Sequence, residues 1–361
     1  MTTPVGSTAI SELGPGDRLT YRGYAIEDLA GKCGYEEVAY LLLRGRLPDS
    51  AELAGYRSRL MGLRTIPGPL LDLLDRIPDG GGPLALMDAL RTACSFLGSL
   101  EPERSFDRRL DAADRLIALL PGLMVTWHRR IAEGERIEPI SDEPSTAGHI
   151  LRLLFDRPPA EVDRRALDAS LVLYADLAFN ASTFACRVCA ATLSDYHSCI
   201  TTGIGTLRGP LHGGASSFVL GLLDAYATPE EAEAGIRERL AKKERLMGFG
   251  HAVFRHRDPR TAILHGLARE LAVARGEERR LAVAEAIERA VLDAKGIFAN
   301  VDFYTACCYR SMGIPLPLFG PLFVCARAAG WSAHVGEQRE RNKLIHPVAE
   351  YTGPPPRPLP R

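Results

Sequence analysis

Apolar residues recur at helical spacing along most of this chain, and this periodicity restricts the possible folds more than any other feature of the sequence. No stretch alternates between apolar and polar residues for long enough to form a substantial β-sheet. Residues 8–28 differ, with short extended pieces separated by turns at Pro15, Gly16 and Gly23. Helices are predicted over 36–44, 50–64, 69–77, 84–98, 107–132, 147–155, from 158–161 onward, the interrupted stretch 164–195, from 215 onward, 229–246, 260–295 and 315–338.

Charge and composition argue against several classes of partner. The 361 residues carry a net charge of −1, and 25% of them are charged, so nothing favours nucleic acid or an anionic membrane surface. No apolar run reaches the roughly 18 residues of a membrane span. The N-terminal segment lacks a basic region followed by an apolar core, which argues against a signal peptide.

Eight cysteines lie mostly within apolar segments, which favours reduced, buried thiols in a cytoplasmic protein over disulfides. Cys186 and Cys189 have the spacing of a metal-binding or redox pair. The sequence holds no second pair of this kind, and the two cysteines lie in an alanine-rich helical run. Core packing is therefore the favoured interpretation, and no metal site is expected.

The segment 247–260, MGFGHAVFRHRDPR, combines glycines, an imidazole and several arginines. Glycines let a ligand approach the backbone closely, and clustered cations are hard to bury without an anionic partner. One interpretation is a loop that offers backbone groups and His251 to a polyanionic ligand, with arginines directed at carboxylate or phosphate. The other is a solvated basic loop between helices, and the segment alone does not decide between them.

Polar residues in otherwise apolar or glycine-rich settings mark further candidates. His212 lies among glycines just before a helix expected to begin at Ala215, whose positive end favours nearby negative charge; a satisfied core histidine is the alternative. Asp302 stands between apolar residues, where desolvation would raise its pKa, or else caps a helix. Arg327, among alanines, needs an anion. The cluster Asn180–Thr183 needs hydrogen-bond partners or a ligand, or caps a helix at a kink.

Three of these segments, GPLHGGA (209–215), GFGHAVFRHRDPR (248–260) and NVDFYTA (300–306), occur in an order and spacing that resemble the citrate synthase family. The resemblance covers nearly the whole chain. It includes ISEL, YRGYAIEDLA and EEVAYLLLRGRLP near the N-terminus, FNASTFACRV in the middle, and GWSAHVGEQ and the P-x-x-x-YTGP pattern near the end.

This resemblance implies an almost all-α homodimer with two domains. A large domain would comprise residues 1–215 and 316–361, and an inserted small helical domain, residues 216–315, would close over the substrates. Closure would exclude water from a reactive enolate.

The resemblance also implies a Claisen condensation of acetyl-CoA with oxaloacetate that gives citrate and CoA, with no metal and no permanently bound cofactor. Asp302 would be the base, His212 would donate a hydrogen bond to the thioester oxygen as a neutral imidazole, and His251 would polarise the ketone. Arg260, Arg327 and His346 would bind the acceptor. Asn180 and Ser182 would shape the wall of the site. Contacts to CoA would come from Leu246, Met247, Gly248, Phe249, Gly250 and Arg255.

Two residues depart from the family pattern. Leu177 replaces the usual histidine three residues before NAST, and His346 replaces an arginine that reaches the site of the other subunit. Both changes should weaken oxaloacetate binding, since a hydrogen bond to a charged group contributes roughly 1.5–3 kcal/mol. Three alternatives to citrate formation therefore stay open: propionyl-CoA as donor, giving 2-methylcitrate; another 2-oxo acid as acceptor; and a non-catalytic paralogue that binds CoA or an acid.

Overall fold

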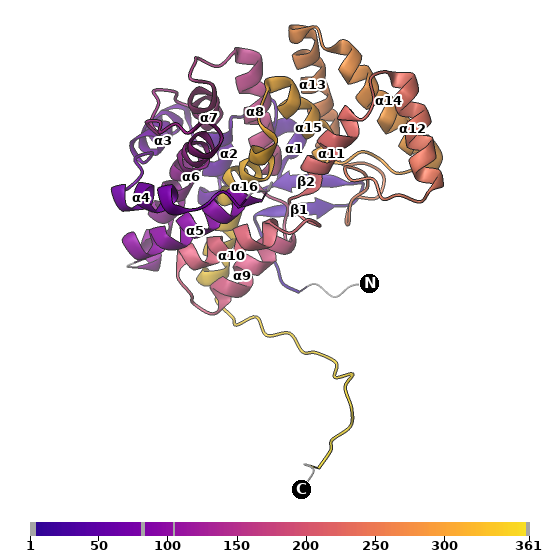
Figure 1. Ribbon diagram of the computed structural model, residues 1–361. Helices are drawn as coiled ribbons and strands as arrows, with labels where there is room; N and C mark the ends of the chain where they lie inside the picture. The colour runs from indigo at the N-terminus through magenta and orange to yellow at the C-terminus, as the bar shows by residue number, and fades with distance from the viewer. Residues whose placement is uncertain (1–4, 81–83, 104, 359–361) are drawn as a thin grey trace.

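Helices make up almost all of the regular structure in the computed structural model, which describes residues 5–80, 84–103 and 105–358 (Figure 1). Residues 1–4, where the segment analysed for a signal peptide begins, and residues 359–361, which end the proline-rich tail, lie outside the described residues. The predicted all-α class is confirmed. The helices are α1 (Ile26–Leu29), α2 (Tyr35–Arg44), α3 (Ser50–Gly62), α4 (Gly68–Arg76), α5 (Ala85–Leu100), η1 (Phe106–Arg108), α6 (Arg109–Glu133), α7 (Thr146–Phe155), α8 (Glu161–Tyr174), α9 (Ala181–Ala191), α10 (Tyr196–Leu207), α11 (Ala215–Asp224), α12 (Pro229–Ala241), α13 (Thr261–Arg275), α14 (Glu278–Lys295), α15 (Val301–Met312), η2 (Leu316–Leu318) and α16 (Phe319–Glu340).

The N-terminal extended pieces form a small antiparallel sheet in the order β1-β2-β3, with β1 (Ser11–Gly14), β2 (Arg18–Tyr21) and β3 (Tyr24–Ala25). Ser11 pairs with Tyr21 and Gly14 with Arg18. The turn between β1 and β2 ends at Asp17, which adopts the left-handed conformation with φ +58°.

Helix α16 lies at the centre of the molecule, and most of its residues are buried (Figure 1). It packs against α2, α6, α8, α9 and α10. Small residues allow this close approach: a Cβ on Gly330 would lie 2.3 Å from the carbonyl oxygen of Ala175. On α10, a Cβ on Gly203 would lie 2.6 Å from Cys186 Sγ and 3.0 Å from the indole of Trp331. These two glycines let α16 contact the chain segments that carry the site.

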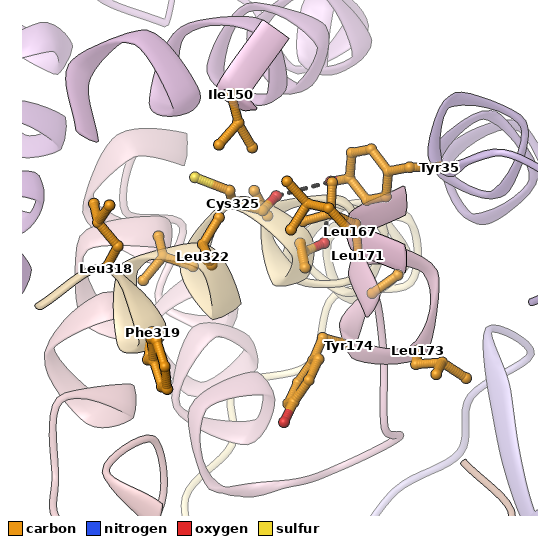
Figure 2. Close-up of a cluster of buried hydrophobic side chains, with 14 of the residues drawn as sticks. Tyr35, Ile150, Leu167, Leu171, Leu173, Tyr174, Leu318, Phe319, Leu322 and Cys325 are labelled. Carbon is orange, nitrogen blue, oxygen red and sulfur yellow. Dashed lines mark hydrogen bonds between the residues drawn. The ribbon is translucent and has the colours of Figure 1, made fainter. Parts of the chain in front are cut away.

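The core beside α16 is formed by leucines from α8, by Ile150 of α7 and by the start of α16 (Figure 2). Leu322 is 1% exposed, and a substitution such as Leu322→Ala would cost about 2–5 kcal/mol of stability through lost burial and a cavity. The buried hydroxyl of Tyr35 donates to the carbonyl oxygen of Cys325 at 2.8 Å, so α2 is fixed to α16 by a polar contact as well.

Three of the predicted helices are shorter or divided in the structure. The stretch 164–195 breaks between α8 and α9, where Ala178 has φ +44°. The stretch 260–295 divides at Gly276, a left-handed residue that ends α13. The stretch 229–246 ends at Ala241, because Lys243 turns left-handed with φ +59°. The break after α8 runs into the polar cluster Asn180–Thr183, where Asn180 caps α9 as the capping interpretation predicted. At Gly276 and Lys243 the residue with positive φ lies within a charged stretch of sequence.

The cysteines are free thiols, and Cys186 is buried in the core, as the packing interpretation predicted. Among the residues that the structure describes, no three or more His, Cys, Asp or Glu side chains are placed to hold a metal ion. Within the same ranges, the helices are too short or too polar to span a membrane.

Candidate active site

Asp302 lies in the first turn of α15, on the second residue of the helix. The helix cap is Asn300, whose Oδ1 accepts the main-chain N–H of Asp302 at 3.1 Å, so the interpretation of Asp302 as the capping residue is wrong. Because Asn300 performs the capping, the carboxylate of Asp302 is free for other contacts. Its side chain remains partly exposed.

The carboxylate of Asp302 accepts a hydrogen bond from the hydroxyl of Tyr174, which is the last residue of α8, at 2.7 Å. Burial raises the pKa of Asp302, while the bond from Tyr174 and the charge of Arg260 oppose that rise. A carboxylate with a raised pKa is a stronger base than a solvated one, and a hydrogen-bond donor such as the Tyr174 hydroxyl favours its ionised form. Its geometry and electrostatics suit a general base.

His212 precedes α11 and contacts the N-terminus of α9 through Ser182. The main-chain N–H of Ser182 donates to Nε2 of His212 at 3.3 Å, and the hydroxyl of Ser182 lies 2.9 Å from the same nitrogen. A main-chain N–H can only donate, so Nε2 is the unprotonated nitrogen and the proton resides on Nδ1. Burial, with the nearby charge of Arg327, lowers the pKa of His212 to about 4.

His251 is held in the opposite tautomer. Its Nδ1 accepts the main-chain N–H groups of Val253 at 3.1 Å and Phe254 at 3.2 Å, so the ring proton resides on Nε2. Burial, with the charge of Arg260, lowers the pKa of His251 to about 4. The ring also stacks on Phe254, with centroids 4.5 Å apart. Both histidines are therefore neutral hydrogen-bond donors at physiological pH, each through one defined nitrogen.

An aromatic platform connects the candidate base with the first of these imidazoles. The ring of Phe323 on α16 lies 4.5 Å from the ring of Tyr174 and 6.1 Å from that of His212, centroid to centroid. The guanidinium of Arg327, one turn further along α16, lies 4.7 Å from the same ring. The structure thus brings residues of α8, α15, α16 and the segment before α11 into one neighbourhood.

Arg327 is fully buried, and part of its guanidinium has no partner. Its Nε donates to the carbonyl oxygen of Tyr174 at 2.7 Å, whereas Nη1 and Nη2 have none among the described residues. Burial lowers the pKa of Arg327. Two unpaired N–H₂ groups on a buried cation favour a bidentate carboxylate.

Arg260, the N-cap residue of α13, is in a different situation. Its guanidinium makes a two-point ion pair with Asp258, with Nε to Oδ1 at 2.9 Å and Nη2 to Oδ2 at 2.8 Å, and both side chains are buried. Asp258 also accepts the main-chain N–H of Val301 at 3.0 Å. The sequence interpretation directed the arginines of this loop at a ligand, but this arginine already has an anion from its own chain.

The loop 246–250 is fixed alongside the start of α15. Gly250 N–H donates to Phe298 O at 2.8 Å, and Asn300 N–H donates to Gly248 O at 2.9 Å. Gly248 has φ +90°, and a Cβ there would lie 2.5 Å from Val219, so only glycine fits. The remaining candidates for CoA contact, Leu246, Met247 and Phe249, are partly buried, whereas Arg255 is exposed.

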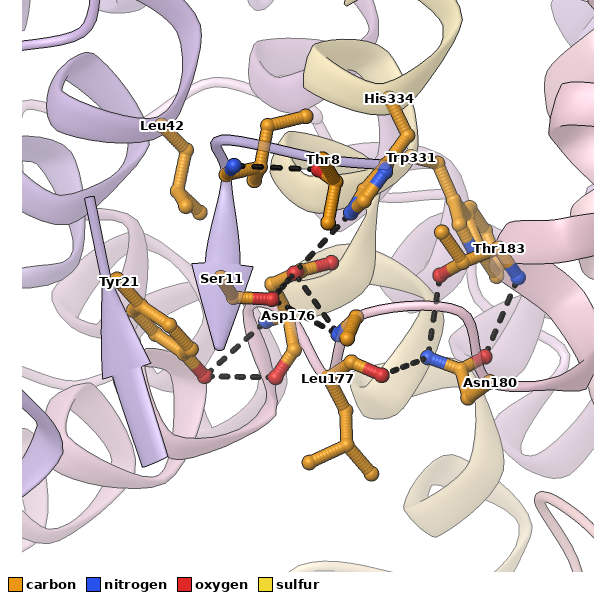
Figure 3. Close-up of polar contacts among 12 residues, drawn as sticks. Thr8, Ser11, Tyr21, Leu42, Asp176, Leu177, Asn180, Thr183, Trp331 and His334 are labelled. Atoms are coloured by element: carbon orange, nitrogen blue, oxygen red, sulfur yellow. Dashed lines mark hydrogen bonds and ion pairs between the residues drawn. The ribbon is translucent and has the colours of Figure 1, made fainter. Parts of the chain in front are cut away.

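Leu177 follows a densely hydrogen-bonded aspartate in the segment between α8 and α9 (Figure 3). The carboxylate of Asp176 accepts bonds from the Ser11 hydroxyl and from His334 Nε2, and the Tyr21 hydroxyl donates to its carbonyl oxygen at 2.8 Å. The side chain of Leu177 points away from these polar groups, is partly buried and packs on the core. The contacts of Asp176 therefore fix the backbone at position 177, where the family pattern usually has a histidine. In this chain the side chain at that position is the isobutyl group of Leu177.

His346 lies beyond α16 in an extended, exposed tail and makes no contact with the site of its own chain among the described residues. Figure 1 shows this tail leaving the body of the molecule.

The comparisons with known proteins agree with this arrangement. The family model "Citrate synthase, C-terminal domain" matches residues 1–348. The chain belongs to the citrate synthase family. The 2-methylcitrate synthase of Shewanella oneidensis is 46% identical over 353 residues, which cover 98% of this chain and 93% of that protein. Citrate synthase 2 of Bacillus subtilis is 41% identical over 342 residues, 94% of this chain and 91% of that protein.

Solved structures of citrate synthases give the same result for the fold. The ternary complex of citrate synthase from Thermoplasma acidophilum with carboxymethyl coenzyme A and oxaloacetate matches with a TM-score of 0.90 and 30% identity, over 99% of this chain and 96% of that one. As a citrate synthase family member, the chain is an acyltransferase.

Sequence reasoning did not single out several residues that build this site. Tyr174, Phe323 and Asp258 contact the candidate residues directly, and Ser182 was taken only for part of the wall although it bonds His212. Asp258, two residues before Arg260, offered a usable signal, because a carboxylate at that spacing can pair with the arginine locally. Tyr174 and Phe323 offered none, since aromatic residues in apolar helices usually pack in the core.

Proposed function

We propose that this chain condenses a short acyl-CoA with oxaloacetate, with acetyl-CoA as the principal donor and citrate and CoA as products. The observation that carries the proposal is that the same chain provides a partly buried, Tyr174-supported carboxylate, Asp302, and two neutral imidazoles of opposite tautomer, His212 and His251. A weakly acidic C–H beside a thioester needs a base and a hydrogen-bond donor together.

In the proposed mechanism, Asp302 removes a proton from the carbon next to the thioester carbonyl. The Nδ1–H of His212 donates to the oxygen that becomes negative, which stabilises the enolate. The enolate carbon then attacks the ketone carbon of the acceptor, whose oxygen receives a hydrogen bond from Nε2–H of His251. A carbon–carbon bond forms as the π bond of the ketone opens, and the resulting alkoxide takes up one proton, which balances the proton removed by Asp302. Water subsequently cleaves the thioester to release CoA and the product acid.

The proposed acceptor site centres on Arg327, whose free Nη groups would hold a carboxylate. Arg260 would contribute as part of its pair with Asp258. The loop residues 246–250 and the exposed Arg255 would contact CoA. The related Thermoplasma acidophilum structure holds a CoA analogue and oxaloacetate, which supports this choice of substrates.

We also propose the domain division 1–215 with 316–361, and 216–315. Its support is that α11 packs on α15, α12 on α14 and α13 on α15, while α16 packs on α2, α6, α8, α9 and α10. A homodimer is proposed with it. The exposed tail carries Leu344, Val348 and Tyr351, apolar side chains that a second copy would cover while His346 reaches its site.

Two observations favour variants of the reaction. The name of the Shewanella relative favours propionyl-CoA as a second donor, giving 2-methylcitrate. Leu177 cannot donate a hydrogen bond, and the charge of Arg260 is already neutralised by Asp258. Among the described residues of the site, Arg327 is then the one buried guanidinium with unpaired nitrogens. This favours a 2-oxo acid that is less acidic than oxaloacetate as acceptor.

One assay tests the function and both variants. Thiol release from acetyl-CoA and propionyl-CoA is measured with oxaloacetate and a panel of 2-oxo monocarboxylic acids. Efficient turnover of acetyl-CoA with oxaloacetate supports the proposal and removes the case for another acceptor. Preference for propionyl-CoA, or for a monocarboxylic acceptor, selects the corresponding variant. CoA binding without thiol release from any pair would point to a non-catalytic paralogue.

A further inference from the structure

The turn between β1 and β2 carries a buried carboxylate, Asp17, that the mechanism above does not use. Its side chain reaches a loop about 240 residues away in sequence and accepts three consecutive main-chain N–H groups. The bonds run from Arg255 to Oδ1 at 2.7 Å, and from His256 and Arg257 to Oδ2 at 2.6 and 3.0 Å. Asp17 is only 7% exposed. These bonds lower the pKa of Asp17, in keeping with an ionised acceptor.

The two N–H groups immediately before this set belong to Val253 and Phe254, and both donate to Nδ1 of His251. Five successive N–H groups, 253–257, therefore converge on two acceptors. Consecutive N–H groups in such a loop form a concave site for an anion, and an ionised carboxylate is a strong acceptor there. In this chain the anion is supplied by the N-terminal sheet.

The same loop continues directly into the acceptor side of the site. Asp258 follows the last of the five N–H groups and holds both Arg260 and the first residue of α15. The segment from Arg255 to Arg260 is thus held by two carboxylates, Asp17 from outside the loop and Asp258 from within it, and Asp258 also ties the segment to the first residue of α15.

We propose that Asp17 is a positioning residue for His251. By holding residues 255–257 it fixes the backbone that directs the N–H groups of Val253 and Phe254 at Nδ1, and so keeps the His251 proton on Nε2. The kinetic part of this inference rests on the proposed function. On the proposed domain division, Asp17 belongs to the large domain and His251 to the small one, so the contact also joins the two.

The test compares full-length Asp17→Ala and Asp17→Asn with Glu12→Gln as the control. Glu12 lies on the same hairpin and pairs with Arg18, and both side chains are more than half exposed. Amide hydrogen exchange of the segment 252–258 is measured in ligand-free protein, together with thiol release and CoA binding. Exchange there should quicken in Asp17→Ala, to a smaller extent in Asp17→Asn, and should stay at the wild-type rate in Glu12→Gln.

If Asp17 positions His251, kcat/KM for the 2-oxo acid falls about ten- to a hundredfold in Asp17→Ala, while the far-UV circular dichroism stays the same. The Kd for CoA, whose proposed contacts include Arg255 on the loosened segment, changes by a smaller factor than kcat/KM. Unchanged exchange in both Asp17 variants would overturn the contact itself. Faster exchange with kcat/KM within about twofold of wild type would overturn the positioning role. An inactive wild type would instead count against the proposed function, and exchange would still decide whether Asp17 holds the loop.

Discussion

The hydroxyl of Tyr174 donates to Oδ1 of Asp302 at 2.7 Å, so the last residue of α8 supports the candidate base at the start of α15. A donor to the ionised carboxylate stabilises the form that removes a proton. Burial acts in the other direction and raises the pKa of Asp302. The balance between these two effects determines the pH at which the base becomes active.

Replacing Tyr174 by phenylalanine removes the stabilising bond, so the pKa of Asp302 should rise further. A hydrogen bond to the carboxylate favours its ionised form, so without it the ionised base is lost at a higher pH. The acidic limb of the pH profile of kcat/KM should therefore move to higher pH. Tyr304→Phe is the matched control, because its hydroxyl bonds Glu288 instead, and its acidic limb should stay in place.

Asp302→Asn should abolish condensation while leaving CoA binding nearly unchanged. A general base contributes about 10²–10⁴-fold to the rate, so activity should fall below roughly a hundredth of wild type. Thiol release and calorimetric titration with CoA measure the two properties separately. Residual activity above that level would contradict the assignment of the base.

Arg327→Met should separate stability from function. The substitution removes a buried guanidinium with two unpaired nitrogens and keeps much of its apolar volume. We expect the ligand-free protein to keep its free energy of unfolding or gain about 1–3 kcal/mol, and to lose the stabilisation that oxaloacetate gives to wild type. Thermal unfolding with and without oxaloacetate measures both.

Arg187→Met is the control for that experiment, because Arg187 is also buried but is paired with Glu337 at 2.6 Å. Its loss removes the cation that neutralises Glu337 and should lower Tm. A similar loss of Tm in Arg327→Met would show that the guanidinium already has a partner in the free protein.

Leu177→His should restore a donor near the acceptor. If oxaloacetate is the acceptor, its KM should fall by about tenfold, as expected for one hydrogen bond to a charged group. The neighbouring Asp176 network fixes the backbone there, so the new imidazole should take a defined position. Unchanged KM for oxaloacetate alongside an increased KM for a monocarboxylic acid would favour the alternative acceptor.

The helical class and the order of most elements could be predicted because apolar periodicity is a local property. Where it failed, the cause was local as well: Gly276 and Lys243 adopt positive φ and divide or shorten predicted helices. Glycine signals this conformation, but lysine rarely adopts it, so the helix end at Lys243 carried no sequence signal. The polar cluster Asn180–Thr183, by contrast, marked the break between α8 and α9, where Asn180 caps α9.

The residues expected to perform chemistry could be chosen from their types and their motifs. The groups that hold these residues in position could not be predicted in this way. Whether Arg260 is free or already paired depends on the direction of the Asp258 side chain, which spacing does not determine. The tautomers of His212 and His251 likewise depend on main-chain N–H groups whose directions exist only in the folded chain.

Gly203 touches neither a candidate base nor a candidate donor, yet it limits how the site can change. The indole that its Cβ would contact also donates, through Nε1, to the Ser182 hydroxyl at 3.1 Å, and Ser182 in turn bonds His212. One added methyl group on α10 would therefore be transmitted through Trp331 and Ser182 to the imidazole. Because residue 203 has no side chain, Trp331 and Ser182 have the room they need to hold the His212 ring in its position.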